Sequence, residues 1–330
     1  MNLSRSATLA EVGEFPLIAA ITDELTLGPD VRVGPGDDAA VLAIDDAVVA
    51  SVDVLVERVH FRRDWSEARD VGRKAVAVNV ADLEAIGARP TGLLVGFSAP
   101  TDLALGWVLD FAEGLRQECN AAGTSLIGGD VTKARDITIA VTALGSLDGR
   151  KPVLRSGARP GDVVAIRGRL GWAAAGLTVL GRGFRSPLVL VEAQRVPQVD
   201  YGAGAVAARA GATSMIDISD GLIADLGHVA WASKVVVNLR RDAFEVAEPL
   251  QAVAGATGKD PYTFIFSGGD DHALAATFPA AESVPEGWLA VGVVEVPDDD
   301  HAGVVVDGMV WELPAGFDHF RTPRPSESRR

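Results

Sequence analysis

Apolar residues recur at helical spacing in several stretches of this chain. In residues 14–25, Leu17, Ile18, Ile21 and Leu25 follow the three-to-four-residue period of a helix that buries one face. The same period predicts further helices over residues 66–87, 102–120, 171–180, 186–195, 203–210 and 221–232. Much of the chain is therefore expected to be helical, with one apolar face on each helix.

Short apolar runs bounded by Gly, Asp or Pro predict strands between these helices. The runs cover residues 39–44, 47–52, 125–127, 136–144, 163–166, 214–218, 235–239, 264–266, 273–278, 289–296 and 304–306. Only Asp45 and Asp46 separate the first two runs, which are expected to form a hairpin. Because helices and strands alternate in both halves, we predict an α/β fold with α+β mixing.

A stretch rich in Gly, Pro and Arg, residues 148–162, interrupts this alternation. Such composition is typical of linkers between domains. A length of 330 residues also favours two domains over one. We therefore predict an N-terminal domain over residues 1–148 and a C-terminal α/β domain over residues 149–330.

Composition and charge exclude several classes of protein. Hydrophobic residues make up 48% and charged residues 23%, as in folded globular chains. A net charge of −15 disfavours binding to nucleic acid or to anionic membranes. No stretch is apolar enough to span a membrane or to act as a secretory signal, so we expect a cytoplasmic protein without nucleic-acid or membrane partners. The single cysteine, Cys119, excludes an intramolecular disulfide and is expected in the core.

Several aspartates stand beside glycines or at the ends of predicted strands. They are Asp37, Asp38, Asp53, Asp82, Asp130, Asp217, Asp220, Asp270 and Asp271. Each one alone has a structural explanation, since Asp is common in turns and at helix N-caps; Asp220 is placed to cap the helix over 221–232. However, α/β folds usually bind ligands at strand ends, and carboxylates suit Mg²⁺ shared with substrate phosphates. The paired glycines at 128–129 and 268–269 would let backbone N–H groups approach a phosphate.

Asp82 is harder to explain as a turn or a cap. On the helix predicted over 66–87, it continues an apolar stripe formed by Val71, Ala75 and Val78. A buried carboxylate without a partner costs several kcal/mol, so a cation should lie nearby. The sequence leaves two candidates open, Lys74 on a similar face of the same helix or a metal ion.

These residues belong to motifs that resemble the thiamine-monophosphate kinase family, within the aminoimidazole-ribotide-synthetase-like superfamily. The motifs occur in family order over nearly the whole chain. They are GEFPLI (13–18), GPGDDAAVL (34–42), SVD with HF (51–61), KAVAVNVADLEAIGARP (74–90), LIGGDVT (126–132), RSGARPGD (155–162), IDISDGLIADLGH (216–228), SGGDDHAL (267–274) and GFDHF (316–320). The P-loop, the dinucleotide-binding fingerprint and the protein-kinase signature are all missing from the sequence.

The resemblance implies a reaction and an assembly. The reaction is phosphoryl transfer from ATP to thiamine monophosphate, giving thiamine diphosphate and ADP with Mg²⁺ as the metal. The implied fold has the two domains of that superfamily, and its N-terminal domain pairs with its copy in a homodimer. Two alternatives are another ATP-dependent enzyme like aminoimidazole-ribotide synthetase, and a protein that binds a nucleotide or thiamine phosphate without catalysis.

The resemblance also implies roles for individual residues. Metal ligands are implied at Asp38, Ser51, Val52, Asp53, Asp82, Asp130, Asp217 and Asp220. Among these, the expected catalytic residues are Asp82, Asp130 and Asp220. Nucleotide contacts are implied at Gly129, Asp130, Arg155 and Ser219, and thiamine-phosphate contacts at His60, Asp270 and Phe317. Val52 stands where the family often has Thr, so only its backbone carbonyl remains as a ligand. Without the resemblance, Arg155 would be a solvated linker arginine, His60 a hydrogen-bonded histidine and Phe317 a core residue.

Overall fold

The fold is taken from a computed structural model, which describes residues 4–22, 25–36, 39–44, 47–297 and 301–317. The earlier elements are α1 (Leu9–Val12), α2 (Glu14–Thr22), β1 (Val31–Val33), β2 (Val41–Leu42), β3 (Val48–Val56), α3 (Ala68–Ala85), β4 (Arg89–Ala99), α4 (Leu105–Ala122), β5 (Leu126–Lys133) and β6 (Thr138–Ser146). The later helices are η1 (Arg155–Gly157), α5 (Trp172–Gly181), α6 (Leu188–Arg195), α7 (Ala203–Arg209), α8 (Leu222–Ser233), η2 (Arg241–Ala243), α9 (Glu248–Thr257), α10 (Tyr262–Ser267) and η3 (Ala281–Ser283). The later strands are β7 (Val163–Arg167), β8 (Ser214–Ile218), β9 (Val236–Leu239), β10 (Ala273–Phe278), β11 (Leu289–Glu295), β12 (Gly303–Val306) and β13 (Met309–Val310).

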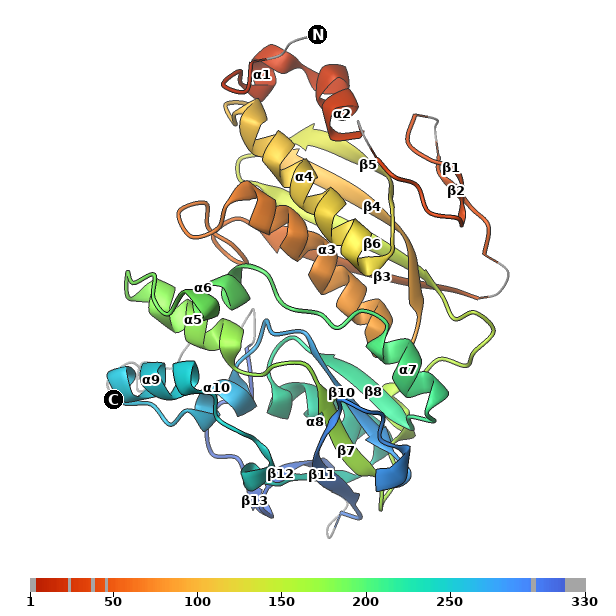
Figure 1. The fold of residues 1–330 in the computed structure, drawn as a ribbon, viewed down its shortest axis with the longest axis vertical. Coiled ribbons are helices and arrows are strands. Elements are labelled where there is room, and N and C mark those ends of the chain that lie inside the picture. Colours follow the sequence, from red (N-terminus) through yellow and green to blue (C-terminus); the bar gives the residue numbers. More distant parts are fainter. Residues whose placement is uncertain (1–3, 23–24, 37–38, 45–46, 298–300, 318–330) are drawn as a thin grey trace.

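Two large mixed sheets organise these elements, and β1 and β2 form a small antiparallel sheet of their own (Figure 1). The first has the strand order β3-β6-β4-β5, in which only the β4–β5 pair is parallel. The second has the order β13-β12-β9-β11-β7-β10-β8, in which only β12 and β9 pair in parallel. Together with the helices they confirm the predicted mixed α/β class.

Helices α3 and α4 cover one face of the first sheet. They approach each other closely at two glycines. A Cβ added to Gly72 would lie 2.1 Å from the carbonyl oxygen of Phe111, and one added to Gly114 would lie 2.1 Å from that of Arg69. Phe111 also packs on Phe97 of the sheet, with ring centroids 5.3 Å apart. Backbone contact between the helices thus depends on the absence of side chains at these two positions.

The opposite face of the first sheet carries exposed apolar side chains on its edge strand β3. Val48, Val52 and Val54 alternate with residues that face α3, and they are 56%, 59% and 40% exposed. We call these three side chains the open face. An apolar row on an edge strand of this kind is a frequent feature of interaction surfaces.

Helix α3 also connects the two halves of the molecule. Its Glu84 side chain accepts hydrogen bonds from the backbone N–H groups of Gly202 and Gly204, at 2.7 and 2.8 Å, where α7 begins. The core around the first sheet extends along the chain to Leu147, and the other two core clusters begin at Val153 and Ala158. The domain boundary at 148/149 stays a prediction.

Two of the predicted elements are wrong. The predicted hairpin over 39–44 and 47–52 does not form, because β2 pairs with β1 and β3 pairs with β6. The run at 264–266 is part of helix α10 and not a strand; a short apolar run fits both kinds of buried element equally well. Strand β4 was not predicted at all. Within the described ranges, no helix is long and apolar enough to cross a membrane.

Candidate functional site

A cavity of about 520 Å³ lies where the two halves meet, between β3, α3, η1 and β8. Four residues with predicted roles line it: Ser51, Asp82, Arg155 and Asp217. We call it the junction cavity. The structure thus brings together three predicted metal ligands and one predicted nucleotide contact from segments far apart in the sequence.

Asp82 lies in the junction cavity among other carboxylates. The Ser51 hydroxyl donates a hydrogen bond to Asp82 Oδ2 at 2.6 Å. Burial raises the pKa of Asp82 to about 6, and the negative charges of Asp217 and Asp53 raise it as well. The hydrogen bond from Ser51 acts in the opposite direction and lowers this pKa. Lys74, the alternative partner considered for Asp82, pairs with Asp270 instead, so that alternative is wrong. Asp82 is therefore crowded by carboxylates.

Asp53 does not end its strand as expected, because β3 continues to Val56. Its backbone N–H donates to Asn79 Oδ1 of α3 at 2.9 Å. Ser51 and Asp53 are two residues apart and share the face of β3 toward α3, whereas the side chain of Val52 belongs to the open face. The side chain of Val52 therefore points away from the junction cavity, and only its backbone remains available there.

The loop over 268–272 lies against the segment that follows β8. The N–H of Asp270 donates to the Ser219 carbonyl at 2.7 Å, and the N–H of Phe317 donates to the Asp220 carbonyl at 3.0 Å. A Cβ at Gly269 would lie 2.4 Å from the Ser219 carbonyl oxygen, so this close approach requires glycine. The backbone thus groups Ser219, Asp220, Asp270 and Phe317. Phe317 is 60% exposed, and its alternative reading as a core residue is wrong.

Two buried side chains contact Asp270, one from helix α3 and one from the loop itself. Lys74 Nζ is 2.5 Å from Asp270 Oδ2, and the ring of His272 lies 3.2 Å from Asp217 and 3.8 Å from Asp270. Burial opposes a charged ring, but the two carboxylates outweigh it and raise the pKa of His272 to about 10. Burial likewise opposes ionisation of Asp270, and Lys74 and His272 reverse this effect and lower its pKa.

Two further aspartates hold the starts of helices. Asp225 Oδ2 accepts from the N–H groups of Asp220 and Gly221, both at 3.0 Å, where α8 begins. Asp220 was predicted to cap this helix and does not, since the N-cap residue is Gly221. Asp271 accepts from Gly171 and Ala173 at the start of α5, at 2.5 and 2.8 Å. Burial raises the pKa of each of these two carboxyls to about 7.

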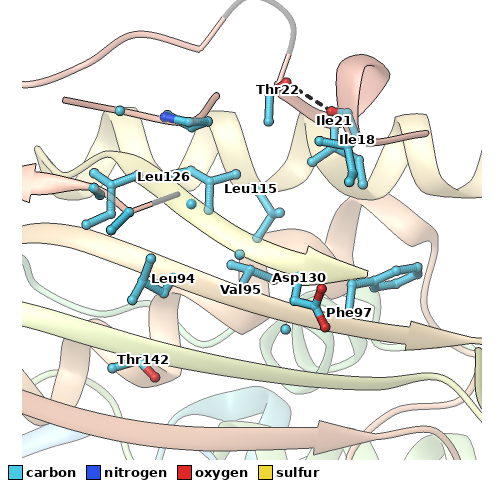
Figure 2. A pocket seen from close by; sticks show the side chains of 18 of the residues that line it. Ile18, Ile21, Thr22, Leu94, Val95, Phe97, Leu115, Leu126, Asp130 and Thr142 are labelled. Carbon is cyan, nitrogen blue, oxygen red and sulfur yellow. Dashed lines mark hydrogen bonds between the residues drawn. The ribbon is translucent and has the colours of Figure 1, made fainter. Parts of the chain in front are cut away.

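A second cavity, of about 1180 Å³, lies around the edge strand β5 (Figure 2). Its lining includes Gly129 and Asp130 together with residues of α2, such as Ile18. We call it the edge cavity. Asp130 lies inside β5 and not after a strand end as expected, and a Cβ at Gly129 would lie 2.0 Å from the Val95 carbonyl oxygen. Glycine at 129 is therefore required by strand packing.

The strand register places Asp130 far from the junction cavity. Asp130 pairs across β4 and β6 with Gly96 and Ala140, and Ala140 pairs with Val54 of β3. Three strand spacings of roughly 4.8 Å put its backbone about 14 Å from β3. Its side chain also takes the face opposite to Ser51, because the neighbouring Gly129 pairs with the buried Val95. Within one chain, the structure does not bring Asp130 to Asp82.

Other predicted positions lie apart from both cavities or outside the described residues. His60 accepts a hydrogen bond from the Val56 N–H at its Nδ1, 3.0 Å away, and lines neither cavity. Asp38 lies outside the described residues. Among the residues that the structure does describe, no three Asp, Glu, His or Cys side chains are already arranged to hold a metal ion. Cys119 is buried in the first core, as expected.

Comparison with known proteins identifies the family. Residues 36–147 match the family described as AIR synthase related protein, N-terminal domain. The thiamine-monophosphate kinase of Mycobacterium tuberculosis is 44% identical over 322 residues, which cover 97% of this chain and 95% of that protein. This chain belongs to the thiamine-monophosphate kinase family.

Solved structures of the thiamine-monophosphate kinase family have the same fold. The crystal structure of the Aquifex aeolicus protein has a TM-score of 0.73 at 32% identity, and covers 81% of this chain and 89% of its own. A structure described as AaThiL complexed with AMPPCP and TMP has a TM-score of 0.74 at 30% identity, and covers 96% of this chain and 100% of its own. The likeness therefore extends over both halves.

Several polar residues of this family member were missed by sequence reasoning. Lys74 was considered only as a partner of Asp82, and His272 and Glu84 were given no role. His272 follows directly after Asp270 and Asp271 in the SGGDDHAL motif, which is the one signal that could have drawn attention to it. Lys74 and Glu84 lie within the motif KAVAVNVADLEAIGARP (74–90), but their partners lie 196 and about 120 residues away in the chain, so no local pattern indicates these contacts.

Proposed function

We propose that this chain transfers the γ-phosphoryl group of ATP to the phosphate of thiamine monophosphate, which yields thiamine diphosphate and ADP. Membership of the thiamine-monophosphate kinase family supports this reaction. The single structural observation that carries it is the junction cavity, where Ser51, Asp82 and Asp217 lie with Arg155. The structure of AaThiL with AMPPCP and TMP supports the pair of substrates.

The nucleophile in this reaction is a phosphate oxygen of thiamine monophosphate. A phosphate monoester has a second pKa of about 6, so it is largely dianionic at neutral pH and needs no general base. The chemical obstacle is repulsion between two anionic phosphates, which positioning and electrostatic stabilisation must overcome. Arg155 is the side chain of the junction cavity suited to a phosphate, because a guanidinium matches phosphate geometry. Gly129, Asp130 and Ser219 remain proposed nucleotide contacts.

The donor set of the junction cavity fits Mg²⁺. Burial raises the pKa of Asp82, and the nearby carboxylates of Asp217 and Asp53 raise it further. This group of hard oxygen atoms suits a divalent cation. We propose that Ser51, Asp82 and Asp217 hold the metal, with Asp38, Asp53, Asp220 and the carbonyl of Val52 as further proposed ligands. Asp130 was predicted as a ligand too, but within one chain it lies too far from Asp82 to share this metal. Mg²⁺ in proteins normally keeps several waters and phosphate oxygens as ligands. Only a few protein side chains therefore need to be in place around the metal site before the substrates bind. When bound, the metal would neutralise and bridge the phosphates.

The loop grouped around Asp270 is the proposed site for thiamine monophosphate. Asp270 and Phe317 are held beside Ser219 and Asp220 by backbone hydrogen bonds. This arrangement places the proposed acceptor residues next to a proposed metal ligand, as in-line transfer requires. His60 is retained as a proposed substrate contact on the family pattern.

We also propose that the chain forms a homodimer through the first sheet. The open face offers Val48, Val52 and Val54 as a continuous exposed apolar row. Covering such a row with a second copy would bury it on both chains. The cytoplasmic location and the lack of nucleic-acid or membrane partners stay predictions from the sequence.

The test is an assay of ADP release with ATP, Mg²⁺ and thiamine monophosphate, with the product identified by mass. Thiamine diphosphate should form in step with ADP, and free thiamine should be a poor acceptor because it lacks the phosphate nucleophile. Binding of both ligands without turnover would favour a binding protein instead. Absence of binding of either ligand would overturn the proposal.

A further inference from the structure

Two buried side chains, Lys74 and His272, form a chain of polar contacts with two aspartates of the proposed site. Lys74 Nζ contacts Asp270 Oδ2 at 2.5 Å and the Gln194 carbonyl at 3.2 Å. His272 Nδ1 lies 3.2 Å from Asp217 Oδ2, and its Nε2 lies 3.8 Å from Asp270 Oδ1. Lys74 and His272 are only 2% and 6% exposed. The order Lys74–Asp270–His272–Asp217 thus joins helix α3 to strand β8.

The backbone holds this chain in an unusual conformation. Asp270 and His272 both have positive φ angles, 70° and 52°, which residues other than glycine rarely adopt. The N–H of His272 donates to the Ile218 carbonyl at 2.9 Å, and Leu274 stands opposite Asp217 in the β10–β8 pairing. Strained residues of this kind persist where the surrounding structure fixes them, and they cluster at functional sites.

The two aspartates of this polar chain serve different parts of the proposed reaction. Asp217 lines the junction cavity, where the metal and nucleotide are proposed to bind. Asp270 lies in the loop proposed for thiamine monophosphate. His272 is the one described side chain that faces both carboxylates, and Lys74 anchors the second of them from the other half of the molecule.

We propose that His272 and Lys74 are positioning residues: they fix Asp217 and Asp270 relative to each other, so that metal-bound and acceptor phosphates are held in line. This inference rests on the proposed function. His272 acts through its two ring nitrogens, one toward the metal side and one toward the acceptor side. Lys74 acts on the acceptor side alone, since its contacts are with Asp270 and Gln194.

Two amide substitutions test the contacts of the two ring nitrogens of His272 one at a time. The short amide of His272→Asn reaches the position of Nδ1, so it preserves the Asp217 contact and loses the Asp270 contact. The longer amide of His272→Gln reaches the position of Nε2 and preserves the opposite contact. We expect His272→Asn to raise the KM for thiamine monophosphate about tenfold, and His272→Gln to raise the half-saturating Mg²⁺ concentration about tenfold.

Lys74 and a binding measurement complete the test. Lys74→Met should raise the KM for thiamine monophosphate about tenfold or more, and Lys74→Arg should recover part of this loss. Calorimetric titration of thiamine monophosphate, without metal or nucleotide, should show weaker binding for Lys74→Met and His272→Asn but not for His272→Gln. His228→Asn, at an exposed position of α8, is the matched control and should behave like wild type.

The outcomes separate this inference from the proposed function. A wild-type protein without kinase turnover would contradict the proposed function itself. The wild type could instead turn over while His272→Asn and His272→Gln change the KM for thiamine monophosphate and the half-saturating Mg²⁺ concentration equally. That result would overturn the positioning role and leave the proposed function standing. Variants that only melt at lower temperature, with unchanged KM, Mg²⁺ dependence and calorimetric affinity, would show that the two residues merely support the fold.

Discussion

At the scale of single residues, four aspartates of this chain illustrate two different tasks. Asp225 and Asp271 accept backbone N–H groups at the starts of α8 and α5. Asp82 and Asp217 line the junction cavity. The sequence placed Asp271 among the ligand candidates, but its position in the fold makes it a helix cap. Proximity to glycine does not distinguish the two tasks, because capping depends on the path of a distant loop.

Asp82→Asn should abolish turnover and leave the fold intact. The substitution removes a carboxylate that is crowded by Asp53 and Asp217, so the free energy of unfolding should stay the same or rise. Loss of a ligand to the metal that would neutralise the reacting phosphates should lower kcat by roughly a hundredfold or more. The measurement is kcat at saturating Mg²⁺ together with a melting curve, with the exposed Asp102→Asn as control. Near-wild-type kcat would refute the metal role.

Asp271 should make stability depend on pH. Burial raises its pKa from an ordinary value near 3.8 to about 7, so between these values the folded state retains a proton that the unfolded chain releases. The stabilisation from Asp271 is therefore fully present below about pH 4 and is lost as the pH rises through 7.

Asp271→Asn cannot titrate. The difference in unfolding free energy between wild type and this variant should therefore shrink from pH 5 to pH 8, by up to a few kcal/mol at about 1.4 kcal/mol per pKa unit. Urea unfolding at the two pH values measures it, and Asp102→Asn should show no such trend. A difference that is constant or widens with pH would contradict the assigned pKa.

At the scale of elements, the long helices were predictable and the short apolar runs were not. The predictions over 66–87 and 102–120 match α3 and α4 closely, because many turns of amphipathic period define them. Residues 264–266 were predicted as a strand because three apolar residues carry no period. The true partner of β3 is β6, about 90 residues later in the chain, and a local pattern cannot reveal that pairing.

Gly114→Ala should destabilise the protein through the contact between α3 and α4. The added methyl group would lie 2.1 Å from the Arg69 carbonyl oxygen, so the helices must move apart. Overpacking of this kind costs about 1–3 kcal/mol or more. Gly227→Ala on α8, where no atom lies within 4 Å of the added Cβ, is the matched control. It should be neutral or stabilising by up to about 1 kcal/mol. Equal unfolding free energies for both variants would contradict the close contact.

At the scale of the whole molecule, the sequence indicated two halves but not how they are joined. The gap between the core that ends at Leu147 and the one that begins at Val153 covers only the first part of the stretch over 148–162. The domain boundary there stays a prediction. The contacts of Lys74 and Glu84 across the halves involve single polar residues without any periodic pattern. The grouping of Ser51, Asp82, Arg155 and Asp217 became visible only once the two halves were placed together.

Val54→Lys should weaken the proposed homodimer. The substitution places a charge within the open face, where a second copy would have to bury it without a partner. Sedimentation at micromolar concentration should show a shift from dimer to monomer. Met309→Lys, at a more exposed apolar position on β13, should leave the size unchanged. A dimer that resists Val54→Lys would place the interface elsewhere.

Helix α3 belongs to both halves, and this has a consequence for how the protein comes apart. A fragment ending near residue 148 would retain Lys74 and Glu84 but lose Asp270 and the start of α7, which satisfy them. If one half unfolded first, the buried polar groups of the other half, such as Lys74 and Glu84, would lose their partners, which is costly. Despite its two large, separate sheets, the chain should lose its structure in a single cooperative transition, with equal calorimetric and van't Hoff enthalpies.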